Sequence, residues 1–202
     1  MTMKMVYAFA EGNAGMRELL GGKGANLAEM TRAGLPVPPG FTVTTEACRL
    51  FFRSGYRLTG ELWRQIELAL EELERNKGQR FGDPANPLLV SVRSGSVPSM
   101  PGMMDTILNL GLNDETVEGL ADLTGDARFA YDCYRRLIQM FGDVVLGVDS
   151  FHFERLLSRL KKDLGVRQDQ EVTAEGWKKL AEEFKKCVRT QAGTDFPQDV
   201  RE

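Results

Sequence analysis

The sequence predicts an α+β fold, with an α/β part in residues 1–112 that holds a mixed sheet and helices, and a mainly helical part in residues 113–202. Two observations lead to this class. Up to Leu112, short apolar β-type runs alternate with helical patterns, whereas beyond it apolar residues recur at helical spacing. A length of 202 residues with 42% hydrophobic content allows a buried core in one domain or two small ones.

Four apolar runs in the first part are expected as strands, namely 6–9, 41–44, 88–92 and 107–110. A helix is expected over 25–33, with Gly34 as its stop, and a second one runs from a cap at Thr44 or Thr45 to about Ser54. Thr59 caps a longer helix with one apolar stripe, formed by Leu62, Ile66, Ala69, Leu70 and Leu73.

In the second part, Asn113, Asp126 and Thr173 each stand before a helical pattern. The expected apolar stripes are Phe129-Tyr134-Leu137-Ile138-Phe141, Phe153-Leu156-Leu157-Leu160 and Trp177-Leu180-Ala181-Phe184-Val188. One short β-type run, 144–146, interrupts them, and the polar tail 193–202 has no evident structural stop. We therefore expect a mainly helical subdomain cut from a longer chain.

Charge and composition restrict the kind of partner and compartment. A net charge of −3 indicates no polyanion-binding surface, so nucleic acid is not expected as a partner. No uncharged apolar run approaches the ~20 residues that cross a bilayer, and residues 1–11 lack the apolar core of a signal peptide. Cys48, Cys133 and Cys187 are odd in number and far apart, which favours free thiols and a cytoplasmic location.

The segment Gly21-Gly22-Lys23-Gly24 precedes a helical pattern and is a candidate phosphate site. A glycine turn that opens a helix presents backbone N–H groups and the positive end of the helix dipole, and a lysine adds a full charge. It is not a Walker A loop, because that motif requires glycine where Arg17 stands and Ser or Thr at Gly24. The alternative is a solvated lysine in a turn.

Arg93 follows the apolar run 88–92 and precedes a loop rich in Gly, Pro, Ser and Met. Strict alternation places Leu88, Val90 and Val92 on one face of the strand and Arg93 on the other. An arginine that leaves a buried strand is costly unless it is paired, and a phosphate is a natural bidentate partner. A salt bridge to an Asp or Glu is the alternative.

Other residues near this loop allow more than one interpretation. The methionines at 100, 103 and 104 suit either core filling or an adaptable loop against a ligand. Asp105 is a turn-former, a cap or a polar contact to a ligand. No pair of neighbouring carboxylates clearly forms a magnesium site. The single histidine, His152, excludes a cluster built on several histidines and is expected to serve packing or capping.

Several of these segments together resemble one family, the pyruvate, phosphate dikinases. They are 20–30 (LGGKGANLAEM), 38–48 (PPGFTVTTEAC), 91–95 (SVRSG), 99–114 (SMPGMMDTILNLGLND), 128–132 (RFAYD), 134–136 (YRR) and 139–141 (QMF). The resemblance runs through most of the chain and thins after about Asp163. The related phosphoenolpyruvate synthases share the G-G-K and V-R-S elements, but the S-M-P-G-M-M-D-T run is dikinase-like.

The resemblance implies an ATP-grasp-like domain that binds ATP with Mg2+. In this family the β-phosphoryl group passes to a histidine on a swivelling domain, the γ-phosphoryl group goes to phosphate, and a carboxy-terminal barrel converts pyruvate to phosphoenolpyruvate. Carried over by position, Lys23 and Arg93 would be catalytic and would neutralise the triphosphate. The loop would close over the phosphates, and the expected binding residues in it are Gly102, Met104, Asp105 and Thr106.

The same resemblance implies parts that this sequence does not contain. The Ser-His motif of the family's phosphohistidine does not surround His152, and the magnesium ligands, one wall of the adenine pocket and the pyruvate-binding domain lie beyond residue 202. Ser96-Val97-Pro98 fills a stretch where some relatives carry a basic residue. We expect an inactive fragment of a cytoplasmic, homo-oligomeric parent enzyme that uses ATP and phosphate. The alternatives are a phosphoenolpyruvate synthase-type ATP domain, a stand-alone nucleotide-binding regulatory module, or a structural helical domain in which Lys23 and Arg93 are surface or salt-bridged groups.

Overall fold

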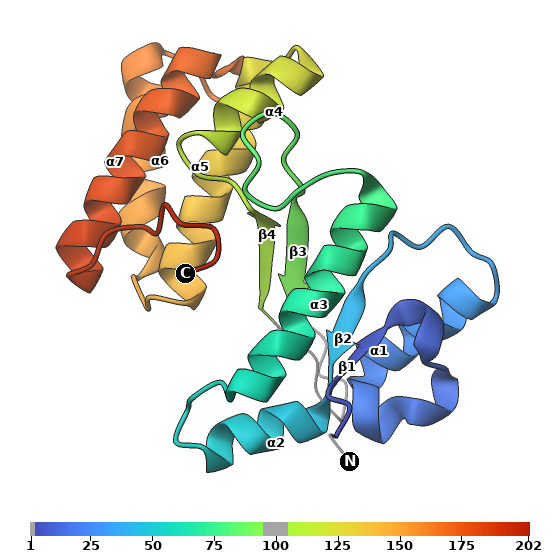
Figure 1. Ribbon diagram of the computed structural model, residues 1–202. Helices are drawn as coiled ribbons and strands as arrows, with labels where there is room; N and C mark the ends of the chain where they lie inside the picture. Colours follow the sequence, from blue (N-terminus) through green and yellow to red (C-terminus); the bar gives the residue numbers. More distant parts are fainter. Residues whose placement is uncertain (1–2, 95–104) are drawn as a thin grey trace. The chain divides into compact units, whose positions relative to one another are not determined.

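The computed structural model describes residues 3–94 and 105–202, and the chain divides into two compact units (Figure 1). One unit holds residues 3–78 with Ser94, and the other holds Gln79–Arg93 with Asp105–Glu202. This division differs from the expected boundary after residue 112. The second pair of strands belongs with the helical unit because Leu89, Ile107 and Leu110 pack against the core of its helices.

The first unit is built on a short strand pair covered by helices. Its elements are β1 (Val6–Ala8), α1 (Arg17–Arg32), β2 (Phe41–Val43), α2 (Thr45–Arg53) and α3 (Gly60–Lys77), with 3-10 turns η1 (Phe9–Glu11) and η2 (Ala14–Met16) before α1. The strands β1 and β2 pair antiparallel, with Val6 opposite Val43. Met5, Val6, Ala47 and Leu62 form one buried cluster, and Leu20, Ala25 and Ala28 form another. Val6 of β1 belongs to the first cluster and the neighbouring Tyr7 packs against the second, so apolar residues contact the strand pair on both faces.

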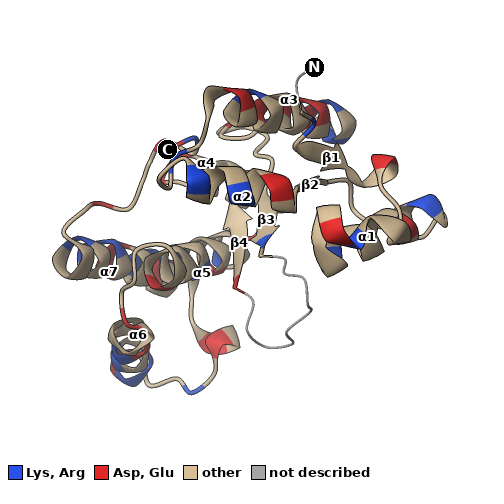
Figure 2. Cartoon of the chain, turned by 90° about the horizontal axis from the view of Figure 1, so that it is seen from below, with Lys and Arg blue, Asp and Glu red and all other residues tan. Residues whose placement is uncertain are grey.

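Two threonines begin the helices of this unit, as predicted. The Thr44 side chain accepts a hydrogen bond from Ala47 N at 3.2 Å, and that of Thr59 accepts one from Leu62 N at 3.3 Å. Gly78, with φ of 64°, ends α3 in the left-handed conformation that glycine adopts most readily. Acidic and basic residues are interspersed along α3 (Figure 2) and include the ion pair of Glu61 and Arg64 at 3.0 Å.

The second unit is a strand hairpin packed on four helices. Its elements are β3 (Val90–Arg93), β4 (Thr106–Leu110), α4 (Thr116–Thr124), α5 (Ala127–Val144), α6 (Ser150–Leu164) and α7 (Ala174–Ala192), with the 3-10 turn η3 (Asp169–Glu171) before α7. The predicted caps Asp126 and Thr173 accept hydrogen bonds from Phe129 N and Gly176 N. Asn113 Oδ1 accepts from the N–H groups of Glu115 and Thr116 at the start of α4.

The predicted apolar stripe of α7 is buried in full, as residues Trp177, Leu180, Ala181, Phe184 and Val188 all lie in the core. In α5 the prediction for Phe129 is wrong, since this ring is 45% exposed. The buried face of that helix includes Ala130, Tyr134 and Ile138, which follow one another at intervals of four residues. Phe129 precedes this series by one position and therefore lies beside the buried face. The short run 144–146 is the end of α5 and a turn instead of a strand.

The described strands form two separate antiparallel pairs, so the expected mixed sheet is corrected. Each pair packs on the helices of its own unit, and the only further bridge among the described residues joins Arg80 and Pro87. The pairing of β3 with β4 shifts between Val90, opposite Leu110, and Val92, opposite Ile107. The extra residue lies in β4, where Asn109 has a φ of 61°.

The extra residue of this β-bulge lies in β4, so the side chains of β3 keep their alternation. Leu88 is buried and Val92 is 48% exposed. Ser91 and Arg93, on the opposite face, are exposed as well, so burial decreases toward this end of the strand on both faces. The Asn109 amide also donates a hydrogen bond to the Cys133 carbonyl of α5 at 3.2 Å, which fixes the bulge to the helical core.

The polar tail is anchored to the second unit, although its sequence shows no stop. Phe196 is buried, with its ring edge-on to Tyr134 and Phe141. The Asn113 side chain donates to the Gln198 carbonyl at 2.9 Å, and the Gln198 side chain accepts from Asp114 N at 3.0 Å.

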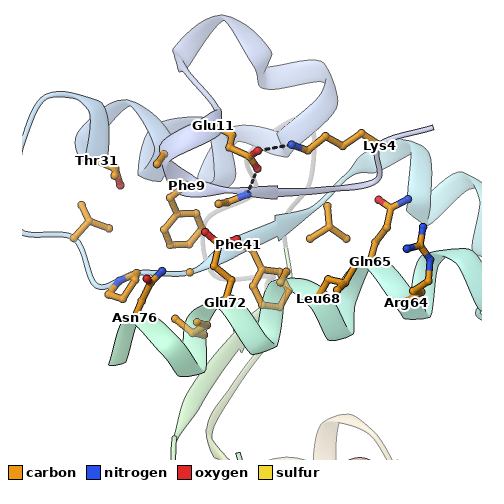
Figure 3. Close-up of a pocket in the computed structure, with 18 of the residues that line it drawn as sticks. Lys4, Phe9, Glu11, Thr31, Phe41, Arg64, Gln65, Leu68, Glu72 and Asn76 are labelled. Carbon is orange, nitrogen blue, oxygen red and sulfur yellow. Dashed lines mark hydrogen bonds and ion pairs between the residues drawn. The ribbon is translucent and has the colours of Figure 1, made fainter. Parts of the chain in front are cut away.

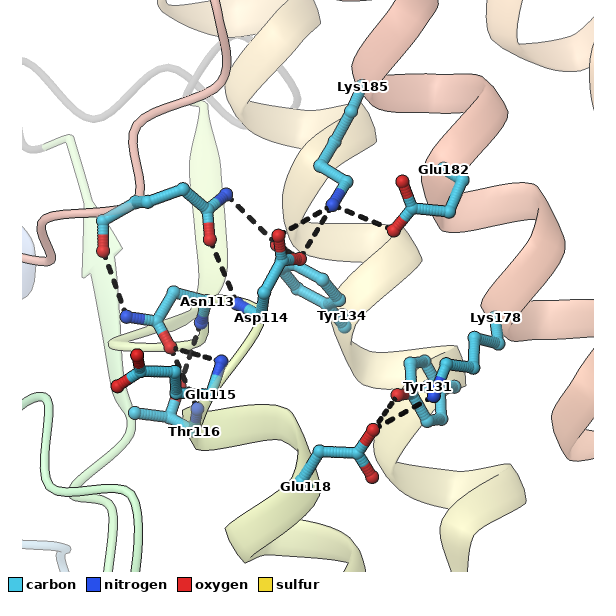
Figure 4. A network of polar contacts seen from close by, with 11 residues as sticks. Asn113, Asp114, Glu115, Thr116, Glu118, Tyr131, Tyr134, Lys178, Glu182 and Lys185 are labelled. Carbon is cyan, nitrogen blue, oxygen red and sulfur yellow. Dashed lines mark hydrogen bonds and ion pairs between the residues drawn. The ribbon is translucent and has the colours of Figure 1, made fainter.

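A polar network surrounds this anchor (Figure 4). Asp114 accepts hydrogen bonds from the Tyr134 hydroxyl at 2.8 Å and from Lys185 Nζ at 2.6 Å, and Lys185 also pairs with Glu182 at 2.8 Å. Burial raises the pKa of Tyr134, which keeps its hydroxyl protonated as a donor. The network therefore joins the start of α4 to α5 and α7. Among the described residues, no helix combines the length and the apolar character that crossing a bilayer requires.

Arg135 is a buried cation that is fully paired in this unit. Its side chain contacts Asp132 and Asp169, the latter at 2.8 Å, and its guanidinium lies 4.4 Å from the centre of the Trp177 ring. Burial alone raises the pKa of Asp169, but the hydrogen bond from Lys161 and the charge of Arg135 outweigh it, and the net pKa lies below its usual value. These charges hold η3 against α5.

We expect Asp169→Asn to lower the free energy of unfolding at neutral pH by about 2 kcal/mol, because a buried guanidinium loses one charged partner. The pKa of Asp169 is lower in the folded chain, so its stabilising contribution is complete above the unfolded-state pKa of about 3.9 and is lost as pH falls through the folded-state pKa. In urea denaturation between pH 7 and pH 2, the free energy of unfolding of the variant should decrease less with falling pH than that of the wild type.

Asp163→Asn is the control, because Asp163 forms an exposed pair with Arg159, and it should change the free energy of unfolding by less than about 0.5 kcal/mol. Equal effects of the two substitutions would contradict the assignment.

Gly119→Ala should destabilise the second unit severely. A Cβ at this position of α4 would lie 1.6 Å from the carbonyl oxygen of Pro84, which is backbone and cannot rotate away. We expect a loss of more than about 2 kcal/mol in denaturant unfolding. Gly60→Ala, in the first turn of α3, meets nothing within 4 Å and should keep wild-type stability. A fully stable Gly119→Ala variant would show that α4 does not pack on Pro84 as described.

Candidate functional site

The glycine turn before Lys23 lies inside α1, which begins at Arg17, earlier than the predicted start at residue 25. Gly21 interrupts the helix with φ of 71° and ψ of 168°. This conformation is essentially restricted to glycine, so the chain makes one helical turn, changes direction and resumes a helix at Gly22. Lys23 is therefore in the first turn of the resumed helix, as the phosphate-site hypothesis requires.

The other two glycines of the turn have different surroundings. A Cβ on Gly24 would lie 2.8 Å from Cγ2 and 2.9 Å from Oγ1 of Thr42, so glycine lets α1 approach β2 closely. A Cβ on Gly22 would meet no atom within 4 Å. Folding therefore requires glycine at positions 21 and 24, whereas the backbone at Gly22 is open on its Cβ side.

Lys23 is partly exposed, and its Nζ donates a hydrogen bond to the carbonyl of Ser94 at 3.3 Å. The structure gives it no ion pair with any described carboxylate. The ammonium group of Lys23 thus lies beside the start of the resumed helix without a carboxylate partner among the described residues.

The Thr45 hydroxyl is a contact of this turn that the sequence analysis missed. Its Oγ1 donates a hydrogen bond to the carbonyl of Glu18, three residues before the interruption, at 2.6 Å. Thr45 is the first residue of α2 and was considered only as a possible helix cap. No spacing rule links positions 18 and 45, so only the packing of α2 beside α1 could reveal the contact.

Arg93 and Thr106 are opposite each other in the register of β3 and β4. Arg93 is exposed at the end of β3, and Asp105 directly precedes β4. Arg93 also has no ion pair with a carboxylate among residues 3–94 and 105–202. The hairpin thus brings three of the predicted site residues to one end. Gly102 and Met104 lie outside the described residues, and Lys23 and Arg93 belong to different units, each described by itself.

A pocket of about 540 Å³ lies in the first unit between η1, the strand pair and α3 (Figure 3). Its walls include the rings of Phe9 and Phe41, and Glu11 in its wall pairs with Lys4. None of the predicted site residues lines it. Three carboxylates and two cations in its lining disfavour a triphosphate, so we do not assign the nucleotide to this pocket.

The fit of a magnesium ion was tested on the acidic side chains. Among the described residues, no three His, Cys, Asp or Glu side chains come together to hold a metal ion. His152, in the first turn of α6, is partly buried with its ring edge-on to Phe151, as expected for packing.

Comparison with known families connects this turn to nucleotide binding. Residues 17–77 match the family model described as the AMP/ATP-binding domain of pyruvate phosphate dikinase. The match begins at the first residue of α1 and ends at the last residue of α3, so it includes the glycine turn, Lys23 and Thr45. This stretch is therefore similar to a nucleotide-binding domain.

Relatives extend the likeness to nearly the whole chain. It is 56% identical over 200 residues to pyruvate, phosphate dikinase of Clostridium symbiosum and 50% identical over 200 residues to pyruvate, phosphate dikinase of Rhizobium meliloti. It is 51% identical over 201 residues to the chloroplastic pyruvate, phosphate dikinase of Mesembryanthemum crystallinum. These matches cover 97–98% of this chain and 21–23% of the relatives. The resemblance of this chain to the amino-terminal region of pyruvate, phosphate dikinases is thus confirmed. It spans between a fifth and a quarter of the length of these curated relatives.

Substituting the two helical glycines separately tests the geometry of the turn. Gly24→Ala should lower the free energy of unfolding by about 1–3 kcal/mol, because the new methyl group overlaps Thr42. Gly22→Ala should leave it within about 0.5 kcal/mol of the wild type or raise it, because the site is open and alanine favours a helix. Urea denaturation followed by circular dichroism measures both. Equal losses for the two variants would contradict the close approach at Gly24.

Proposed function

We propose that this chain supplies phosphate-binding residues of the ATP site of a pyruvate, phosphate dikinase. One observation supports this proposal most directly. Lys23 lies in the first turn of a helix that resumes after an interruption at Gly21, whose conformation only glycine adopts readily, and this stretch matches an AMP/ATP-binding domain. Backbone N–H groups at a helix start and an ammonium group are complementary to a triphosphate.

The proposed roles follow the position of each residue. Lys23 and Arg93 contact phosphoryl oxygens and offset the negative charge that the triphosphate carries during transfer, so both are proposed as catalytic. Asp105 and Thr106 make polar contacts at the end of the hairpin that holds Arg93, and Gly102 and Met104 belong to the intervening loop. An ATP-grasp-like arrangement of the parent domain is part of this proposal.

The remaining steps are proposed for other parts of the parent enzyme. Its overall reaction converts ATP, phosphate and pyruvate to AMP, diphosphate and phosphoenolpyruvate through a phosphohistidine on another domain. The ligands of Mg2+ and the pyruvate site are likewise assigned outside this chain, so residues 1–202 alone should not turn over. We propose a homo-oligomeric parent in the cytoplasm, the location favoured by the cysteine content, whereas the plant relatives are named chloroplastic.

Calorimetric titration with ATP, with and without magnesium, should show weaker binding for both Lys23→Ala and Arg93→Ala than for the wild type. Loss of one charge-assisted contact to a phosphate corresponds to about tenfold in the dissociation constant. Exposed cations away from the turn provide controls, and Lys162→Ala and Arg53→Ala should bind as the wild type does. Unchanged binding by the Lys23 and Arg93 variants would remove both residues from the site.

Two further outcomes separate this proposal from its alternatives. A ligand that binds only the folded state raises the melting temperature, so a wild-type chain whose melting temperature is the same with and without ATP would favour a structural helical domain. Release of AMP and diphosphate by the 202-residue chain in the presence of pyruvate and phosphate would contradict the assignment of those steps to other domains.

A further inference from the structure

The interruption at Gly21 creates a hydrogen-bonding problem in α1. In a regular α-helix the carbonyl of Glu18 accepts a hydrogen bond from the N–H of residue 22. Gly21 has φ of 71° and ψ of 168°, far from helical values, so the regular repeat is broken between these residues. The Glu18 carbonyl instead accepts a hydrogen bond from the Thr45 hydroxyl at 2.6 Å.

Thr45 is held in place by its buried neighbour. The Thr44 side chain is almost fully buried and caps α2, and its backbone N–H donates to the Met5 carbonyl at 2.9 Å. Thr42, two residues earlier in the same segment, lies against Gly24 on the other side of the interruption. The segment 42–45 therefore supports the turn from both sides, through packing at Gly24 and through a hydrogen bond at Glu18.

We propose that Thr45 is a positioning residue for the phosphate site. Its hydroxyl satisfies the Glu18 carbonyl and so leaves the N–H groups that begin the resumed helix at Gly22 for phosphate oxygens. This inference rests on the proposed function, since it assigns those N–H groups to the same triphosphate that Lys23 contacts. The Cβ side of Gly22 is open, so no neighbouring atom covers the backbone on that side.

The test compares Thr45→Val and Thr45→Ser with Thr31→Val. Valine keeps the shape of threonine without the donor, and serine keeps the donor. Thr31 is the matched control, because its Oγ1 donates to the Leu27 carbonyl at 2.8 Å near the other end of the same helix. Both valine variants lose one hydroxyl-to-carbonyl hydrogen bond. The Leu27 carbonyl lies in a regular stretch of helix and keeps its backbone partner, so Thr31→Val should lose less stability than Thr45→Val in urea denaturation.

The probes are sodium tripolyphosphate and magnesium-ATP, followed by the amide signals of Gly22 and Lys23 in nitrogen-15 NMR. We expect both signals to shift in the wild type, and Thr45→Val to weaken tripolyphosphate binding by about fivefold, the effect of one hydrogen bond. Thr45→Ser and Thr31→Val should bind as the wild type does. Wild-type affinity in Thr45→Val, or equal weakening in Thr31→Val, would overturn the role of Thr45 and leave the proposed function intact.

Absence of any shift at Gly22 and Lys23 in the wild type would overturn the phosphate site itself, and the role of Thr45 with it. Binding of tripolyphosphate with equal weakening in Thr45→Ser and Thr45→Val would show that the threonine methyl group, and not the hydroxyl, supports the turn. That result would also overturn the inference.

Discussion

The position of Lys23 depends on the contact between the backbone of α1 at Gly24 and the side chain of Thr42 in β2. Any larger residue at 24 would push the helix away from the strand pair. Gly21 and Lys23 are within three residues of Gly24 in the sequence. The contact at Gly24 therefore also fixes the position of the resumed helix and the direction of its positive end. The strand pair of the first unit is small, but it gives the glycine turn a rigid support.

Features that depend on local sequence were predicted from it. The caps Thr44, Thr59, Asp126 and Thr173 were identified because a side chain needs only the next three residues to satisfy the first N–H groups of a helix. The stripe of α7 was predicted because its apolar residues share one face of the helix. The resemblance to pyruvate, phosphate dikinases was also confirmed, since it rests on long contiguous motifs.

Features that depend on tertiary structure could not be predicted. The β-bulge at Asn109 is one such feature, because a residue inserted into a strand is defined only by the register with the partner strand. The grouping of the hairpin with the helical unit is set by the contacts of Leu89 and Ile107. The three glycines of the glycine turn also differ in their surroundings: Gly21 interrupts the helix, Gly22 is open on its Cβ side and Gly24 contacts Thr42. The roles of Lys23 and Arg93 stay predictions.

The anchoring of the tail has a consequence for the order of folding during synthesis. Phe196 and Gln198 complete the packing around Tyr134 and Asn113, and Val200 lies against Gly82, at the beginning of the second unit. These contacts join parts of the chain that leave the ribosome far apart in time. The first unit, whose helices and strands all precede Gln79 in the chain, has its core available early. In the second unit, the core residues from Leu112 to Val188 emerge first, and the contacts of Phe196, Gln198 and Val200 complete its packing only after the tail has emerged.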